Sequence, residues 1–129
     1  MLFGPLGPSL APQVRASRGL SKFLAPIAHW YARTVGHRRM GLRYDDLLIE
    51  ERADVQRALS RLPQKEAYDR AFRHRVAFQQ SLLHKDLPKD QWVKAEEDVR
   101  YFKPYVEEVV KEDTERAMWD TMKVMKSQH

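Results

Sequence analysis

The chain has 129 residues, of which 32% are charged and 43% hydrophobic, and only 5 glycines, a composition that suits one small helical domain. It contains no cysteine, which excludes disulfides, cysteine-held iron–sulfur clusters and cysteine nucleophiles, and no stretch approaches the roughly 20 apolar residues of a membrane-spanning helix. The net charge of +5 lies at one end, because residues 1–44 hold seven Lys or Arg and no acid, whereas the remainder holds 16 basic and 18 acidic side chains.

Residues 1–20 form the first segment of the chain. They contain Pro5, Pro8 and Pro12, two arginines and no acidic side chain, so they are expected to be flexible. A basic, serine-containing and acid-free composition is typical of a mitochondrial targeting segment. The alternative is a plain flexible tail, and whether the segment is cleaved stays open.

Residues 21–44 follow as a basic amphipathic arm. Apolar side chains recur there at the i, i+4, i+7 and i+11 spacing of one helical face: Leu20, Leu24, Ile27 and Tyr31. Because Pro26 lacks an N–H donor and clashes with the preceding turn, we expect the helix to start near Pro26 or to kink there. Gly36 and Gly41 then bracket a basic loop. A basic amphipathic helix lies on a membrane surface or docks to a partner.

Residues 45–129 form a helical body that prolines divide. A first short helix is predicted to end at Pro63, and a second, of about 18 residues, to end before Pro88. Pro88 suits the first turn of a third helix with Trp92 on one face, and Pro104 opens the last helix. No alternating strand pattern occurs. We therefore predict an all-α fold, a basic N-terminal segment followed by about four helices punctuated by prolines.

The predicted helices carry separate, narrow apolar stripes rather than one wide shared face. A body of this size folds only marginally even when it buries a compact core. We therefore expect the helices to pack on partner subunits, and the isolated chain to be weakly folded.

No set of side chains has the spacing of a catalytic or metal site. The histidines lack the i,i+4 spacing of two metal ligands on a helix and are interpreted as surface residues: His29, His37, His74, His84 and His129. The acids Asp45-Asp46 and Glu96-Glu97-Asp98 are not tied by spacing to a histidine or a nucleophile, so we interpret them as capping or solvated side chains. The sequence predicts no catalytic, cofactor-binding or metal-binding residue.

The arm carries the first candidate contact site for a partner or lipid. Trp30 and Tyr31 precede the basic loop with Arg38, Arg39 and Arg43, and no acid within the arm neutralises these charges. The alternative is a solvated basic segment with one core tryptophan.

Trp119 is the second candidate contact residue. It lies on the last predicted helix, on a stripe of charged side chains. A tryptophan on a charged face is typical of a contact anchor, although a frayed C-terminus would give it no such role.

Short strings in a fixed order also indicate a family. They cover roughly residues 30–110: Trp30-Tyr31, Gly41-Leu42-Arg43-Tyr44-Asp45-Asp46, Arg61-Leu62-Pro63, Tyr68-Asp69-Arg70-Ala71-Phe72-Arg73, Leu87-Pro88-Lys89-Asp90-Gln91-Trp92 and Pro104-Tyr105-Val106. In this order and spacing the strings resemble the small matrix-side subunit of respiratory complex III (ubiquinol–cytochrome c oxidoreductase), the 14 kDa or subunit 7 family. No single string is diagnostic, and the evidence lies in the ordered set.

The resemblance implies a non-catalytic accessory subunit that supports assembly and stability around cytochrome b, in electron transfer from ubiquinol to cytochrome c. It implies a peripheral position on the matrix side of the mitochondrial inner membrane. The implied partners are cytochrome b, the core subunits and anionic lipid, in a hetero-oligomer without nucleic acid. Haem, iron–sulfur and ubiquinone are expected in neighbouring subunits, and no cofactor is expected on this chain.

The alternative function is a small helical mitochondrial RNA- or ribosome-associated protein that uses the basic N-terminal arm. A nucleic-acid binder is expected to continue its Lys and Arg along a helix of the body and to bind in a strongly salt-dependent way. The body is near-neutral instead, with 16 basic and 18 acidic side chains, which favours the first interpretation.

Overall fold

The computed structural model describes residues 4–123, and within that range every regular element is helical, which confirms the all-α prediction. The elements in chain order are α1 (Ala11–Ala16), α2 (Arg18–Val35), η1 (His37–Met40), η2 (Tyr44–Leu47), α3 (Ala53–Ser60), α4 (Gln64–Leu83), η3 (Lys89–Gln91) and α5 (Lys103–Thr121). The three η elements are short 3₁₀ turns. Residues 124–129 of the predicted body lie outside the described residues.

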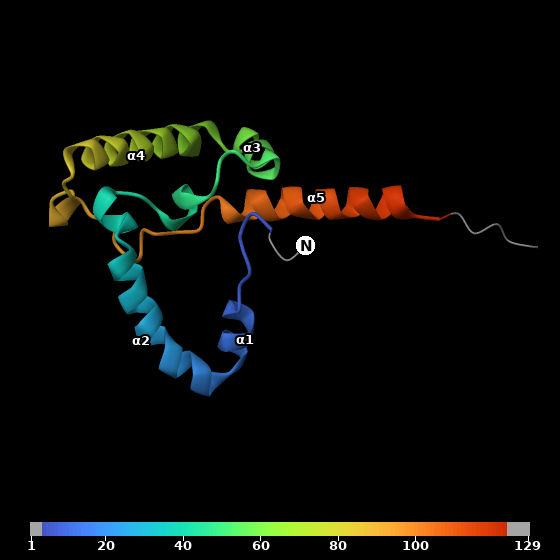
Figure 1. Ribbon diagram of the computed structural model, residues 1–129, viewed down its shortest axis with the longest axis horizontal. Coiled ribbons are helices and arrows are strands. Elements are labelled where there is room, and N and C mark those ends of the chain that lie inside the picture. The colour runs from blue at the N-terminus through green and yellow to red at the C-terminus, as the bar shows by residue number, and fades with distance from the viewer. Residues whose placement is uncertain (1–3, 124–129) are drawn as a thin grey trace, which may run out of the picture.

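The helices form an open arrangement rather than a closed bundle (Figure 1). Helices α3 and α4 lie along one side of the body, α5 runs beneath α3, and the far half of α5 projects beyond it. Helices α1 and α2 form a V that hangs from the body, with α2 attached through η1 (Figure 1). Helices α1 and α2 thus form a limb apart from the body, whereas residues 37–44 of the predicted arm lie against the body.

The core lies between α3 and α5 and is small. Its buried members, drawn from these helices and the turns beside them, are Val55, Ala58, Leu62, Phe102, Val106 and Val109. Leu6, from the segment before α1, packs against this cluster and so ties the N-terminal segment to the body. The segment expected to be flexible thus contains a core contact as well as helix α1.

Helix α2 runs continuously through Pro26, so the expected start at that residue is wrong. The helix begins at Arg18, directly after Ser17, whose backbone is extended. It ends at Gly36, which adopts the left-handed conformation (φ 82°) that glycine supplies without steric cost at a helix C-terminus. Pro26 therefore removes one hydrogen bond within an 18-residue helix without ending it.

The prediction of a helix that starts at Pro88 is also wrong, because only the short turn η3 forms there. The backbone groups of this segment bond to the arm instead. The N–H of Leu87 donates to the carbonyl of Arg39 and the N–H of Val93 to that of Arg38, each at 3.1 Å. The N–H of Val93 cannot also serve a helix, and the backbone at Trp92 is extended.

The remaining proline boundaries are confirmed. Helix α3 ends before Pro63, α4 ends before Pro88, and Pro104 lies in the first turn of α5. The last residue of α4 is followed by His84 in the left-handed conformation (φ 52°), which stops the helix.

Candidate functional site

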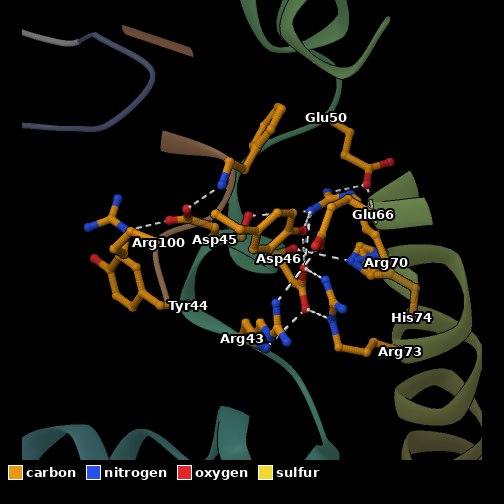
Figure 2. A network of polar contacts seen from close by, with 12 residues as sticks. Arg43, Tyr44, Asp45, Asp46, Glu50, Glu66, Arg70, Arg73, His74 and Arg100 are labelled. Atoms are coloured by element: carbon orange, nitrogen blue, oxygen red, sulfur yellow. Dashed lines mark hydrogen bonds and ion pairs between the residues drawn. The ribbon is translucent and has the colours of Figure 1, made fainter. Parts of the chain in front are cut away.

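The most densely bonded side chain of the described structure is Asp46 in η2 (Figure 2). Its carboxylate is fully buried, and Arg73 of α4 donates to it from Nε at 2.7 Å and from Nη2 at 3.0 Å. It also accepts the hydroxyl of Tyr101 and, at 2.9 Å, the N–H of Arg43. Burial alone raises the pKa of Asp46, but the hydrogen bonds from Arg73, Tyr101 and the Arg43 backbone outweigh it and hold the pKa below its usual value.

Arg70 extends this network into the body. It is buried, and its Nη1 lies 3.3 Å from Asp46 and 3.1 Å from the Tyr101 hydroxyl. Its Nη2 donates to Glu50 at 2.5 Å, and its guanidinium lies 5.6 Å from the centre of the Phe102 ring. Because Arg70 carries one charge into the core, it requires the carboxylates around it.

Asp45, beside Asp46, points to the opposite side and binds the start of α5 (Figure 2). It is fully buried and accepts the N–H groups of Phe102 and Lys103, each at 3.0 Å, together with Nε of Arg100. A carboxylate in this position satisfies free N–H groups at a helix N-terminus and favours the positive end of the helix dipole. The capping role expected for this pair is confirmed, whereas the solvated alternative is wrong.

Asp98 is a third buried carboxylate, placed between the arm and the body. It accepts Nε2 of His37 and Nε of Arg38, each at 2.9 Å, and the N–H of Tyr44 at 2.8 Å. Burial raises the pKa of Asp98, but the hydrogen bonds from His37, Tyr44 and Arg38 outweigh burial and hold the pKa below its usual value. His37 is therefore a buried, paired histidine, and its interpretation as a surface residue is wrong; His129 lies outside the described residues.

Together the three carboxylates fix the arm on the body. They join η1 and η2 to α4 and to the segment that leads into α5, over separations of 24 to 61 residues along the chain. Removing one member of such a buried pair costs about 3–5 kcal/mol. The residues serve placement rather than catalysis, since each carboxylate is held by cations and N–H donors.

The arm arginines predicted as contact residues all meet acids of the body. Arg38 is bound to Asp98, and Arg39 lies 3.9 Å from Asp86 with its guanidinium 5.5 Å from the Trp92 ring centre. Arg43 lies 4.0 Å from Glu66 and over the ring of Tyr101, at 5.6 Å. The expectation that these charges are not neutralised holds within the arm but is wrong for the folded chain.

The aromatic contact residues are all exposed. Trp30 and Tyr31 on α2 are each 65% exposed, and Trp119 on the projecting end of α5 is 70% exposed. None of them is the core tryptophan of the alternative interpretation. The structure brings the arm residues to one limb and leaves Trp119 at the other end of the body (Figure 1).

Arg70, Arg73 and Tyr101 were not predicted as site residues from the sequence. The sequence contains part of the evidence for this site, since Arg70 and Arg73 are three residues apart and share one face of a helix. Their common partner, Asp46, lies 24 and 27 residues earlier, a separation that helical periodicity does not report.

Residues 4–123 contain neither a candidate metal site nor a candidate membrane span. No cluster of three or more His, Cys, Asp or Glu side chains suited to a metal ion occurs in this range. None of its helices combines the length and the hydropathy that crossing a bilayer requires.

Comparison with known proteins places the chain in a family. Residues 18–117 match the model of the ubiquinol-cytochrome C reductase complex 14kD subunit. The cytochrome b-c1 complex subunit 7 of Neurospora crassa is 46% identical over 93% of this chain and 98% of its own length. The mitochondrial subunit 7 of Saccharomyces cerevisiae is 41% identical over 83% of this chain and 84% of its own, and that of Homo sapiens is 42% identical over 76% and 87%. The chain therefore belongs to the 14 kDa subunit family of the ubiquinol–cytochrome c reductase complex, as the ordered strings of its sequence indicate.

Proposed function

We propose that this chain supports the assembly and stability of respiratory complex III around cytochrome b. Membership of the family makes it a non-catalytic subunit of that mitochondrial complex. The proposal adds what the subunit does there: it offers several docking surfaces on a scaffold held by buried ion pairs.

The observation that carries the proposal is the imbalance between buried and exposed apolar side chains. Within residues 4–123 only seven apolar residues are buried, whereas nineteen large apolar or aromatic side chains are exposed. Most of the exposed set falls on three surfaces, on α2, on α4 and on the end of α5. Their members include Phe23, Ile27, Trp30, Tyr68, Phe72, Leu82, Met118 and Trp119. Apolar patches of this extent mark interaction sites, and we assign them to cytochrome b and the core subunits.

We assign α2 to contact with cytochrome b and with the anionic surface of the inner membrane. Its exposed apolar side chains share one face, while Lys22, His29 and Arg33 lie on the opposite face of the same helix. This division is typical of helices that lie in a membrane interface. It supports a peripheral position on the matrix side for the chain, with haem, iron–sulfur and quinone chemistry in the neighbouring subunits.

The RNA- or ribosome-associated alternative is not favoured. A nucleic-acid binder needs arginines that can neutralise phosphates. The body offers no excess of basic groups for this role, because it holds 16 basic against 18 acidic side chains.

Two glutamate substitutions on opposite faces of α2 test the proposed docking. Ile27→Glu places an unpaired charge in the apolar face, whereas His29→Glu places the same charge on the basic face, where it stays in water. In cells that rely on the variant chain, we expect Ile27→Glu to deplete assembled complex III on native gels and His29→Glu to leave most of it. Equal amounts of complex with both variants would refute docking through the apolar face.

A further inference from the structure

A cleft opens where the arm meets the body. It has a volume of about 370 Å³ and lies between the last turn of α2, η1 and the segment before α5. Its apolar wall is formed by Tyr31, Ala32 and Val35, and its polar side by Arg38, Asp98 and Arg100. This volume lies within the range of about 300–1,000 Å³ that is usual for small-molecule sites.

Each arginine of the cleft is fixed by a hydrogen bond from its Nε to a carboxylate. Arg38 donates from Nε to Asp98 at 2.9 Å, and Arg100 donates from Nε to Asp45. The guanidinium of Arg100 also lies over the ring of Tyr44, 4.6 Å from its centre, with its tip directed away from Asp45 (Figure 2). Among residues 4–123 no acceptor is assigned to the Nη groups of either arginine. Two pairs of oriented Nη groups are thus left for a ligand.

The carboxylates behind these arginines do not compete with an incoming anion. Asp98 is 3% exposed and already accepts three donors, and Asp45 is fully buried with donors of its own. Their charges fix the arginines in place, and the recognition rests on hydrogen-bond donors in a preset geometry. Guanidinium forks match phosphate oxygens in this way, bidentately.

The shape of the cleft points to an amphiphile rather than to a bare ion. Its wall contains Tyr31 and Val35, which belong to the exposed apolar face of α2, and that face continues from the cleft along the helix to Ile27 and Phe23. A ligand bound at the arginines therefore has an apolar surface beside it for a hydrocarbon chain. Lys22 and Arg33, which belong to the arm but not to the ion pairs described above, add a positive field that favours an anionic form.

We propose that this cleft binds the phosphodiester headgroup of an anionic phospholipid, with Arg38 and Arg100 on the phosphate and the acyl chains along the apolar face of α2. The inference rests on the proposed contact of α2 with the membrane and gives that contact a specific site. It assigns a role to Arg100, which the sequence patterns do not single out.

Two variants of the full-length chain test the cleft while preserving its charge or its ion pairs. Arg38→Lys with Arg100→Lys keeps both charges near Asp98 and Asp45 but removes the Nη groups. Ala32→Leu fills the cleft and leaves every ion pair intact, and Ala28→Leu, one turn earlier on α2 and outside the cleft, is its control. Circular dichroism establishes that each variant keeps the wild-type helix content.

Binding is measured by co-sedimentation with vesicles of phosphatidylcholine alone or of equal parts phosphatidylcholine and phosphatidylglycerol. We expect wild type and Ala28→Leu to prefer the anionic vesicles. The double lysine variant and Ala32→Leu should bind them about tenfold more weakly, equivalent to about 1.4 kcal/mol. Inorganic phosphate at matched ionic strength should compete poorly, because it lacks the acyl chains.

Each other outcome overturns a distinct part of the reasoning. Unchanged binding by both cleft variants would reject the cleft and leave the membrane contact of α2 intact. Efficient competition by inorganic phosphate would assign the cleft to free phosphate. Variants that lose assembled complex III in cells but bind vesicles normally would assign the cleft to an acidic side chain of a partner. A wild-type chain that binds neither vesicle would reject the membrane contact itself, while the docking test on cytochrome b assembly stays independent.

Discussion

Replacing Asp46 by Asn is the most informative perturbation of the scaffold. The change keeps the size of the side chain but removes the one carboxylate shared by Arg70 and Arg73, whose side chains are 6% and 12% exposed. Breaking a buried ion pair from one side costs about 3–5 kcal/mol, because the remaining charge is left without its partner. Glu50, at 2.5 Å from Arg70, offsets part of this cost, so we expect about 3 kcal/mol.

A loss of this size is decisive for a chain with so small a core. The whole free energy of unfolding of a natural domain is about 5–15 kcal/mol, and only seven apolar residues among the described ones are buried here. Urea unfolding of the full-length chain, followed by circular dichroism, should therefore show Asp46→Asn losing most of the weak transition that we expect of the isolated wild-type chain. Asp69→Asn, on an exposed position of α4, removes the same charge and should change stability by less than about 0.5 kcal/mol. A loss below about 1 kcal/mol for Asp46→Asn would refute the view that this network holds the arm and α4 together.

The other predictions concern pH, the arm contact and membrane attachment. The pKa values of Asp46 and Asp98 are lowered in the folded chain, so their stabilisation is present above the unfolded value of 3.8 and is lost as the pH falls through the lower folded values. The urea midpoint should therefore drop as the pH is lowered from about 5 to about 2, and a flat profile would contradict this assignment. Trp92→Phe removes the 2.7 Å hydrogen bond from the indole N–H to the Leu87 carbonyl. The loss should lower the free energy of unfolding by about 1 kcal/mol in the same urea experiment. An unchanged midpoint would show that this bond does not contribute to stability. Alkaline carbonate should release the chain from mitochondrial membranes, and its retention in the pellet would argue against a peripheral position.

The parts of the fold set by local chemistry were predictable from sequence. Pro63, Pro88 and Pro104 lie at or beyond helix boundaries because proline disfavours a helix interior, and α3, α4 and α5 follow these limits, although α2 tolerates Pro26. The apolar spacing in the arm likewise predicts α2, although the helix starts earlier than expected.

The parts set by distant contacts were not predictable from one sequence. The segment around Trp92 has helical signals, yet its backbone N–H groups donate to the carbonyls of Arg38 and Arg39, more than 45 residues earlier. The residues next to Asp98 in the sequence predict a capping or solvated side chain. In the structure Asp98 is buried instead, because His37 of the arm packs against it. Periodicity reports which face of an element is apolar, but not which element supplies the partner for a charge.

The same limit applies to the contact surfaces. The sequence singles out Trp30, Tyr31 and Trp119, and the structure leaves all three exposed. The cleft beside Tyr31 depends on Arg100, which lines it together with Arg38 only because the segment before α5 meets the arm there. No local pattern brings these two arginines together.

The proposed function requires this chain for building complex III around cytochrome b. Native electrophoresis of mitochondrial membranes, probed with antibodies to this chain and to cytochrome b, compares cells with and without the chain. We expect both proteins to migrate in one large complex, and we expect this complex and its cytochrome b to be depleted when the chain is removed. Normal amounts of assembled complex without the chain, or migration of the chain apart from cytochrome b, would contradict the proposed function.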